Sequence, residues 1–190
     1  MRLLLIILLS ALYLQGTAKT SLLPPGTDTA KKDIKKEVHF PDPANVSKLF
    51  YFQRDPNTNT LIYELNIDKA GELNRETPLH VYWIKYADKG QKEELNYIQR
   101  KFAYGLNIKE VKPEEWDIHF AAYKKLPLKL LKGVDGKYHI FTIIGKKQAI
   151  LNRIFVKIEG GSFWLPNIIY AELKGTDAAT GKEVMERFKP

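Results

Sequence analysis

The chain has 190 residues, a formal net charge of +8 and no cysteine. This length fits a single domain with a sizeable core, and the lack of cysteine excludes disulfides, a catalytic thiol, a thiolate metal site and attachment as a bacterial lipoprotein. The 30 basic residues are 24 Lys and only 6 Arg, scattered without a basic stripe, which favours a solvated surface or attraction to an anionic surface and predicts no nucleic-acid partner.

The first eighteen residues have the pattern of a secretory signal peptide. An apolar run at residues 3–14 follows the positive Arg2, and small residues precede a cleavage point after about Ala18. This run is shorter than the roughly 20 residues that a membrane-spanning helix needs. We therefore expect export to the periplasm or the extracellular side, with an uncleaved membrane anchor as the alternative.

Residues 19–45 are expected to form a flexible tether. Prolines, threonines, aspartates and a run of lysines outweigh the apolar residues there, so little burial would offset the entropy cost of ordering the segment. The rest of the chain, residues 46–190, is expected to be one β-rich domain.

Strand patterns begin directly after the tether. Residues 48–54 are aromatic and β-prone, a turn with Pro and Asn follows, and residues 61–67 alternate with period two, which together indicate a hairpin. Residues 78–86 carry large side chains on both faces, which is typical of a central strand.

Residues 90–103 are predicted to form the one helix. Leu95, Ile98 and Phe102 have the i, i+3, i+7 spacing of an amphipathic helix. Acidic residues near its start and basic residues near its end suit the helix dipole, and Gly105 is a natural stop.

Strand patterns then continue to the C-terminus, at residues 116–123, 128–132, 138–144, 150–158, 168–173 and 184–188. Gly, Asp and Asn turns separate them, and no βαβ alternation is visible. The sequence therefore predicts a mainly β fold, an antiparallel β-sandwich or barrel of about 8–9 strands with one amphipathic helix packed on it.

No motif indicates a catalytic or metal site. Three histidines fall on separate predicted strands: His80, His119 and His139. They lack metal-ligand spacing, so we expect no metal and no cofactor, with their convergence across a sheet as the alternative. No serine sits in a nucleophile elbow, and the spacing of the strand carboxylates Glu64, Asp117 and Glu172 does not set them apart from surface residues.

Aromatic residues concentrate around the predicted helix and its flanking strands. Neighbouring strand residues face opposite sides of a sheet, so Tyr82 and Trp83 cannot both point inward. An aromatic-lined pocket with Arg100 as cationic partner is one interpretation, and a helix that simply plugs the sheet is the other. The candidate ligand-binding residues are Tyr82, Trp83, Arg100, Tyr104, His119 and Tyr123.

Several runs of residues together resemble a known family. They are LFY at 49–51, NTNTLIYELN at 57–66, PLHVYWI at 78–84, IQRKFAYG at 98–105, IGK at 144–146, LNR at 151–153, YAELKG at 170–175 and TG at 180–181. Over residues 46–190 the chain resembles a domain-of-unknown-function family of small exported bacterial proteins. The resemblance implies a bacterial source and an envelope location, and it brings no activity or catalytic residue.

Three hypotheses about function remain open. The lack of a catalytic constellation favours a non-enzymatic binding or accessory module for a small apolar ligand or an envelope protein. The second is an envelope hydrolase whose site is assembled only in the fold, from His119, Glu64, Asp117 and Arg100. The third is subunit assembly through an exposed strand edge.

Overall fold

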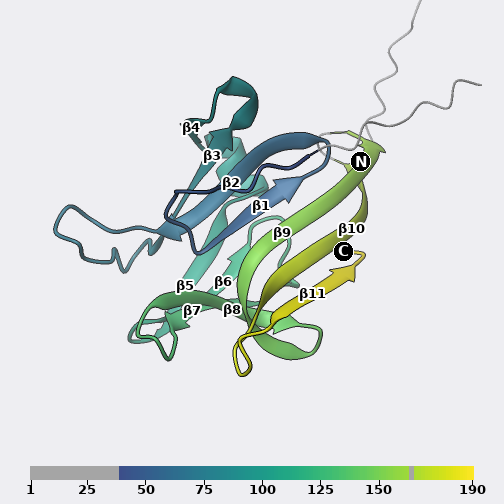
Figure 1. Cartoon of the computed structure of the whole chain (residues 1–190). Helices are drawn as coiled ribbons and strands as arrows, with labels where there is room; N and C mark the ends of the chain where they lie inside the picture. The colour runs from purple at the N-terminus through teal and green to yellow at the C-terminus, as the bar shows by residue number, and fades with distance from the viewer. Residues whose placement is uncertain (1–38, 163–164) are drawn as a thin grey trace, which may run out of the picture. The chain divides into compact units, whose positions relative to one another are not determined.

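The computed structural model describes residues 39–162 and 165–190, all within the unit Glu37–Pro190. The predicted signal peptide and most of the predicted tether lie outside these residues. Eleven strands form in the described part of the chain (Figure 1): β1 (Phe50–Arg54), β2 (Asn57–Leu65), β3 (Leu79–Lys85), β4 (Gln91–Glu94), β5 (Leu106–Lys112), β6 (Glu115–Phe120), β7 (Leu128–Lys132), β8 (Tyr138–Ile144), β9 (Lys147–Gly161), β10 (Pro166–Asp177) and β11 (Glu183–Phe188). A 3-10 turn, Tyr86–Asp88, and one short helix, α1 (Tyr97–Phe102), complete the fold. The prediction of a mainly β domain with one helix is confirmed.

All strands belong to one sheet, and the long strand β9 is its centre. The strand order is β4-β3-β2-β1-β9-β8-β7-β6-β5, while β10 pairs with the other edge of β9 and carries β11. The start of β9 pairs with β8, and its middle pairs with β1 in parallel, the one parallel pair among the described strands. Because β8 and β1 share one edge of β9, the sheet divides there into two branches.

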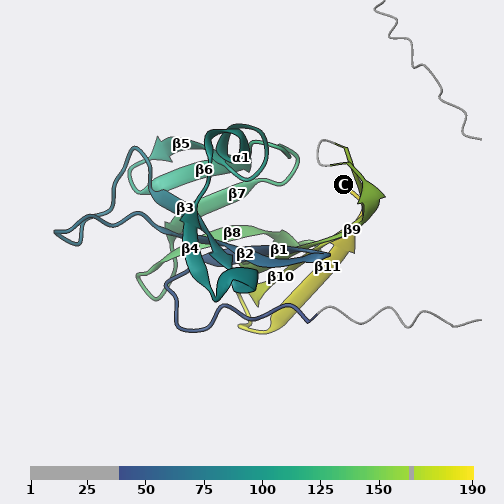
Figure 2. The ribbon, with the colours of Figure 1, turned by 90° about the horizontal axis from the view of Figure 1, so that it is seen from above.

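The two branches fold over each other into a half-barrel. In Figure 2, strands β5, β6 and β7 lie above β8, β1 and β2, while β10 and β11 extend the lower layer. Strand twist and the register shifts in the β9–β10 pair permit this curl, because each shift bends the strand and adds local twist.

A closely packed core fills most of the space between the layers. Phe50 stacks on Tyr63 with ring centroids 4.3 Å apart, and Phe120 from the opposite layer meets both rings edge-on. We call the fully buried residues here the filled core: Phe50, Leu61, Tyr63, Ile118, Leu130, Ile140, Ile144, Ala149 and Leu151. Alternation with period two places these side chains on the inner faces.

The helix is shorter than predicted, and the boundaries 90–103 are wrong. Gly90 has a positive φ and completes a turn, after which β4 pairs antiparallel with β3. All four residues of β4 are exposed, so the acidic residues that suggested a helix start belong to an edge strand. The helix begins after Asn96, which forms a capping box with Gln99.

The predicted apolar stripe of the helix is mostly exposed. Ile98 and Phe102 are 46% and 55% exposed, and the buried Leu95 precedes the helix. The predicted stop is supported, because a Cβ at Gly105 would collide with the carbonyl oxygen of Arg100. The helix therefore covers one end of the layered space instead of packing along the sheet.

Strand β5 was not predicted at all. Leu106 and Ile108 are its partly buried residues, and the remaining residues are exposed on an edge of the sheet. An edge strand needs no continuous apolar face, so its sequence carries only a weak period-two signal.

The last residues of the predicted tether contact the sheet. The Phe40 ring lies edge-on to Phe155 at 5.0 Å, and Gln53 Nε2 donates to the carbonyl oxygen of Pro41. Packing therefore starts several residues before the expected domain start at Val46. Among the described residues, none of the helices has the length and apolar character needed to cross a membrane.

Candidate functional site

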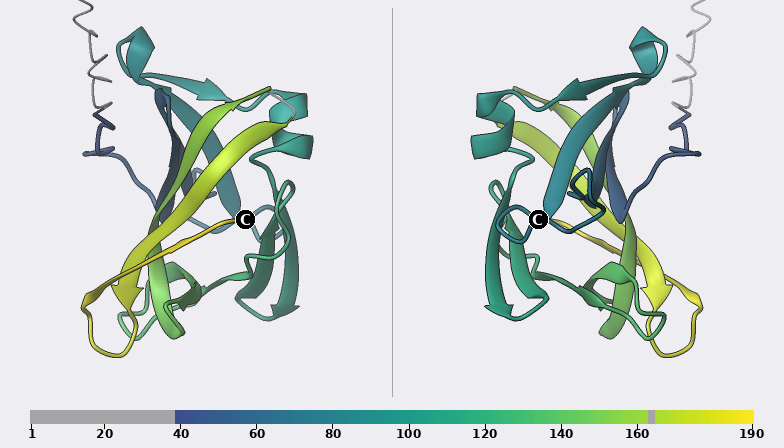
Figure 3. Two further views of the ribbon diagram at one scale, coloured as in Figure 1. Left: turned by 90° about the vertical axis from the view of Figure 1, so that its right-hand side faces the viewer. Right: turned by 90° about the vertical axis from the view of Figure 1, so that its left-hand side faces the viewer.

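An apolar cavity of about 310 Å³ lies next to the filled core, where the two layers separate. Strands β1, β9 and β10 and the end of β11 form one wall, and the end of α1 and the connection between β6 and β7 form the other. Figure 3 shows α1 at the same end of the ribbon as the tip of the β9–β10 hairpin. The lining residues are Phe52, Arg54, Phe102, Ala103, Tyr104, Phe120, Ala122, Tyr123, Leu126, Ile154, Val156, Ile158, Pro166, Ile168, Ala171, Leu173, Phe188 and Pro190.

The local sequence explains why these side chains meet. Phe50, Phe52 and Arg54 share one face of β1, so the face that enters the filled core continues into the cavity. Ile154, Val156 and Ile158 alternate in the same way along β9. The second half of β1 and the segment 154–158 of β9 therefore present every second residue to the cavity.

Aromatic rings and one cation give the cavity its chemical character. Phe52 lies edge-on to Tyr104 at 5.7 Å, and Tyr123 stacks on Phe188 at 6.4 Å. The Arg54 guanidinium carbon lies 5.6 Å from the centre of the Tyr104 ring, within reach of a cation–π contact. Burial raises the pKa of the Tyr104 hydroxyl, and the nearby charge of Arg54 acts in the opposite direction.

The size of the cavity suits a short alkyl chain. A dry cavity of about 150 Å³ in another protein holds benzene, and this cavity has roughly twice that volume. Ligand pockets in proteins begin at about 300 Å³. A chain of roughly ten to twelve carbon atoms would fit on this comparison.

Two of the six sequence-predicted site residues, Tyr104 and Tyr123, line the cavity. A third, Trp83, lies directly behind this wall, edge-on to Tyr104 with ring centroids 5.2 Å apart. Its indole nitrogen donates to Gln99 Oε1 at 3.4 Å. Tyr104 and Tyr123 would contact a ligand in the cavity, and Trp83 supports the wall through its contact with Tyr104.

The other three predicted residues do not line it. Tyr82 faces the opposite side of β3 from Trp83, under Lys92, whose Nζ lies 4.7 Å from the Tyr82 ring centre. Arg100 is on the surface of α1, 3.7 Å from Glu94. His119 points away from the filled core on β6, and its Nδ1 has no hydrogen-bond partner among the described residues.

Most lining residues were missed at the sequence level. A strand was predicted at residues 150–158, but its sequence gave no sign that one face of it lines an open space. Arg54 had a usable signal, because it follows Phe50 and Phe52 at period two and therefore shares their inward face.

Charged groups form a separate cluster on the outer face of β2, β3 and β4. His80 Nδ1 lies 3.0 Å from Glu64 and its Nε2 lies 2.8 Å from Glu94, which also approaches Arg100. Burial lowers the pKa of His80, but the two carboxylates outweigh it, and the pKa is raised. This cluster contributes no residue to the cavity.

The remaining carboxylate candidates also have local partners. Asp117 pairs with Lys129 at 3.3 Å, and the buried Glu172 lies between Arg153 and Arg187. The described residues contain no group of three or more His, Asp or Glu side chains placed to hold a metal ion.

A family model described as a domain of unknown function, DUF4833, matches residues 50–187. The chain belongs to this family. The DUF4833 match begins at the first residue of β1 and ends within β11. It therefore contains every residue that lines the cavity except Phe188 and Pro190. No curated protein and no solved structure matches the chain significantly.

Proposed function

We propose that this DUF4833 protein is a non-enzymatic binding module that holds a small apolar ligand in the cavity beside α1. The observation that carries the proposal is the cavity itself, an apolar space of about 310 Å³ with one charged side chain among its lining residues. Protein interiors otherwise contain few voids larger than a water molecule. A bound alkyl chain would fill this space.

The expected affinity follows from the buried chain. Ten methylene groups at about 0.8 kcal/mol each give roughly 8 kcal/mol before the cost of association is subtracted. We therefore expect dissociation constants no tighter than about micromolar for a neutral alkyl compound.

The hydrolase hypothesis has less support. It required His119, Glu64, Asp117 and Arg100 to converge in one concave site, and none of the four lines the cavity. Glu64 and Arg100 both belong to the surface cluster around His80, while Asp117 and His119 lie on β6.

We also propose that the protein acts after export, in the periplasm or at the cell surface. The positive start, the short apolar run and the small residues before Lys19 support this. N-terminal sequencing of protein recovered from the producing cell's envelope or medium should give a start near Lys19. An intact Met1 on protein retained inside the cell would contradict the proposal.

Calorimetric titration of the full chain with 1-decanol tests the binding function. We expect one molecule to bind per chain in the native protein and an affinity loss of about tenfold or more in Ala171→Phe, because Ala171 lines the cavity and a phenyl ring would occupy it.

Ala179→Phe is the matched control, since it makes the same change at an exposed turn residue. Its affinity should equal that of the native protein. Absence of decanol binding, or equal binding by Ala171→Phe, would refute the cavity as the site.

A further inference from the structure

Arg54 is set apart from the other arginines of the described chain. Arg75, Arg100, Arg153 and Arg187 each lie within ion-pair distance of a carboxylate. For Arg54, no described residue supplies an ion pair or a side-chain hydrogen bond. It is also the one charged side chain among the described lining residues of the cavity.

The position of Arg54 makes this lack of a partner informative. Arg54 is the last residue of β1, and its side chain is half-buried against the apolar walls of the cavity. A guanidinium presents several donors in a planar fork that matches a carboxylate or a phosphate. A cation kept at the edge of an apolar cavity is therefore suited to the charged end of a ligand whose other end is apolar.

Tyr104 adds a second donor beside Arg54. The guanidinium lies over the Tyr104 ring, and among described residues the Tyr104 hydroxyl has no hydrogen-bond partner while not being fully enclosed. The hydroxyl can donate to an anionic oxygen without breaking an existing bond.

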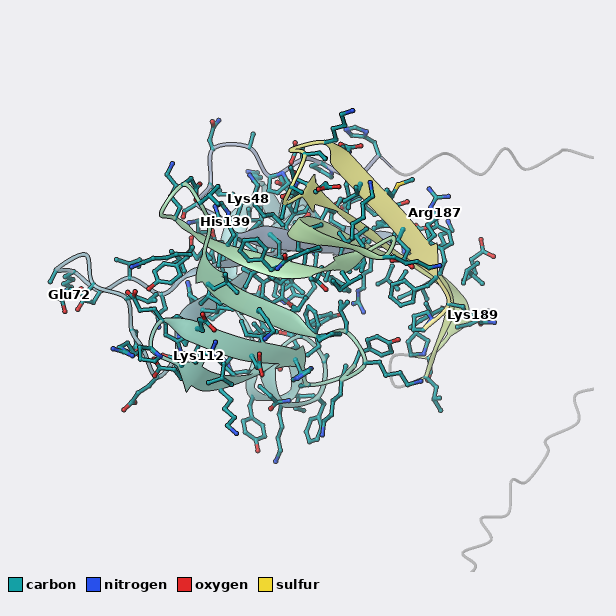
Figure 4. All side chains as sticks on the ribbon, turned by 90° about the horizontal axis from the view of Figure 1, so that it is seen from below. Lys48, Glu72, Lys112, His139, Arg187 and Lys189 are labelled. Carbon is teal, nitrogen blue, oxygen red and sulfur yellow. The ribbon has the colours of Figure 1, made fainter. Side chains whose placement is uncertain are left out.

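Two of the segments around the cavity contain basic residues and no acidic residue, whereas the strands β9 to β11 contain both. Residues 95–109, which include α1, contain two lysines and Arg100 but no acidic residue, and residues 118–134 contain four lysines and no acidic residue. At the end of β11, Lys189 stands between the lining residues Phe188 and Pro190 (Figure 4). These basic groups favour an anion on the side of the cavity formed by α1 and the β6–β7 connection.

We propose that the ligand is a single-chain anionic amphiphile, whose alkyl chain fills the cavity and whose carboxylate or phosphate is bound by Arg54. This inference rests on the proposed binding function and narrows it to one ligand class. The head group contacts Arg54 and Tyr104 at the edge of the cavity, and the chain lies against the alternating residues of β9.

Three ligands with the same ten-carbon chain test the inference at neutral pH: decanoate, decyl phosphate and 1-decanol. We expect at least one of the two anions to bind the native full chain about tenfold or more tightly than decanol does. Whichever anion binds more tightly identifies the natural head group as a carboxylate or a phosphate.

The Arg54→Gln variant should lose this preference, so that its affinity for the anions falls to about its own affinity for decanol. A circular dichroism spectrum equal to that of the native chain shows that the variant has folded. Arg54→Lys should retain part of the preference, because it keeps the charge without the fork. Arg100→Gln is the control, since it removes an exposed arginine that already has a carboxylate partner, and it should keep the full preference.

The outcomes separate the two proposals. If decanol binds but neither anion binds more tightly, or if Arg54→Gln retains the preference, the assignment of Arg54 is overturned and the cavity remains a binding site. If none of the three ligands binds, the proposed function itself is overturned.

Discussion

The filled core and the cavity occupy the same space between the layers but differ in how their walls are built. In the filled core, strands from both branches face each other, and aromatic rings such as Phe50, Tyr63 and Phe120 close the gap. At the cavity, β9 and β10 instead face the end of a six-residue helix and the β6–β7 connection. Facing strands can bring side chains together along their whole length, whereas a helix end and a loop reach only a few points.

Small residues add to this difference. Three alanines, Ala103, Ala122 and Ala171, line the cavity, whereas Ala149 in the filled core is surrounded on all sides and fully buried. An apolar surface alone does not close a protein interior, because side-chain volume must also match the distance between the layers.

Replacing Ala149 and Ala171 by phenylalanine should give the largest difference in stability between the two regions. Ala149→Phe should lower the free energy of unfolding by about 1–3 kcal/mol or more, because the filled core has no room for the ring. Ala171→Phe should leave it unchanged or raise it, because the ring buries apolar surface in an existing space. Urea unfolding of both variants beside the native chain measures the difference.

Equal destabilisation by the two substitutions would contradict the contrast, since it would mean that the cavity closes around Ala171 in solution. Ala179→Phe again serves as the surface control and should unfold at the native urea concentration.

A smaller effect should come from His80, on the outer face of β3 and outside both regions. Its pKa is raised in the folded protein, so its stabilising contribution is complete below the ordinary pKa of about 6.5 and disappears as pH rises through the folded-state value. His80→Gln should therefore weaken the loss of stability between about pH 6 and pH 8. The change should remain below about 1 kcal/mol, because the cluster is partly exposed.

Urea unfolding across this pH range measures the effect, with Glu93→Gln as the control, because Glu93 neighbours Glu94 on β4 but pairs with Lys85. The slope against pH should be native-like in the control and shallower in His80→Gln. Decanol affinity should be the same in all three proteins, since His80 does not line the cavity. A native slope in His80→Gln would show that the two carboxylates do not stabilise the charged imidazole.

Sequence patterns predicted strand segments best where both neighbours are other strands. The predicted strands 61–67 and 150–158 correspond mainly to β2 and β9, because strands paired on both sides must bury apolar side chains. The exposed edge strands β4 and β5 were missed, since their residues meet no such demand. The spacing of Leu95, Ile98 and Phe102 predicted a helix that exists only in part. Residues 91–94 follow the turn at Gly90 and pair with β3 as a strand instead.

The sequence by itself determined that the domain is mainly β, that it is free of disulfides and that Tyr82 and Trp83 face opposite ways. Only the tertiary structure decided that Trp83 is the inward residue, that the sheet curls at β9, and that Phe52, Arg54 and Val156 meet Tyr104 and Tyr123 around one space. The physical reason is that the two kinds of feature depend on residues at different separations along the chain. Period-two alternation is a local consequence of strand geometry, whereas the cavity depends on the distance between segments as far apart in the chain as those of Phe52 and Phe188, which local patterns do not encode.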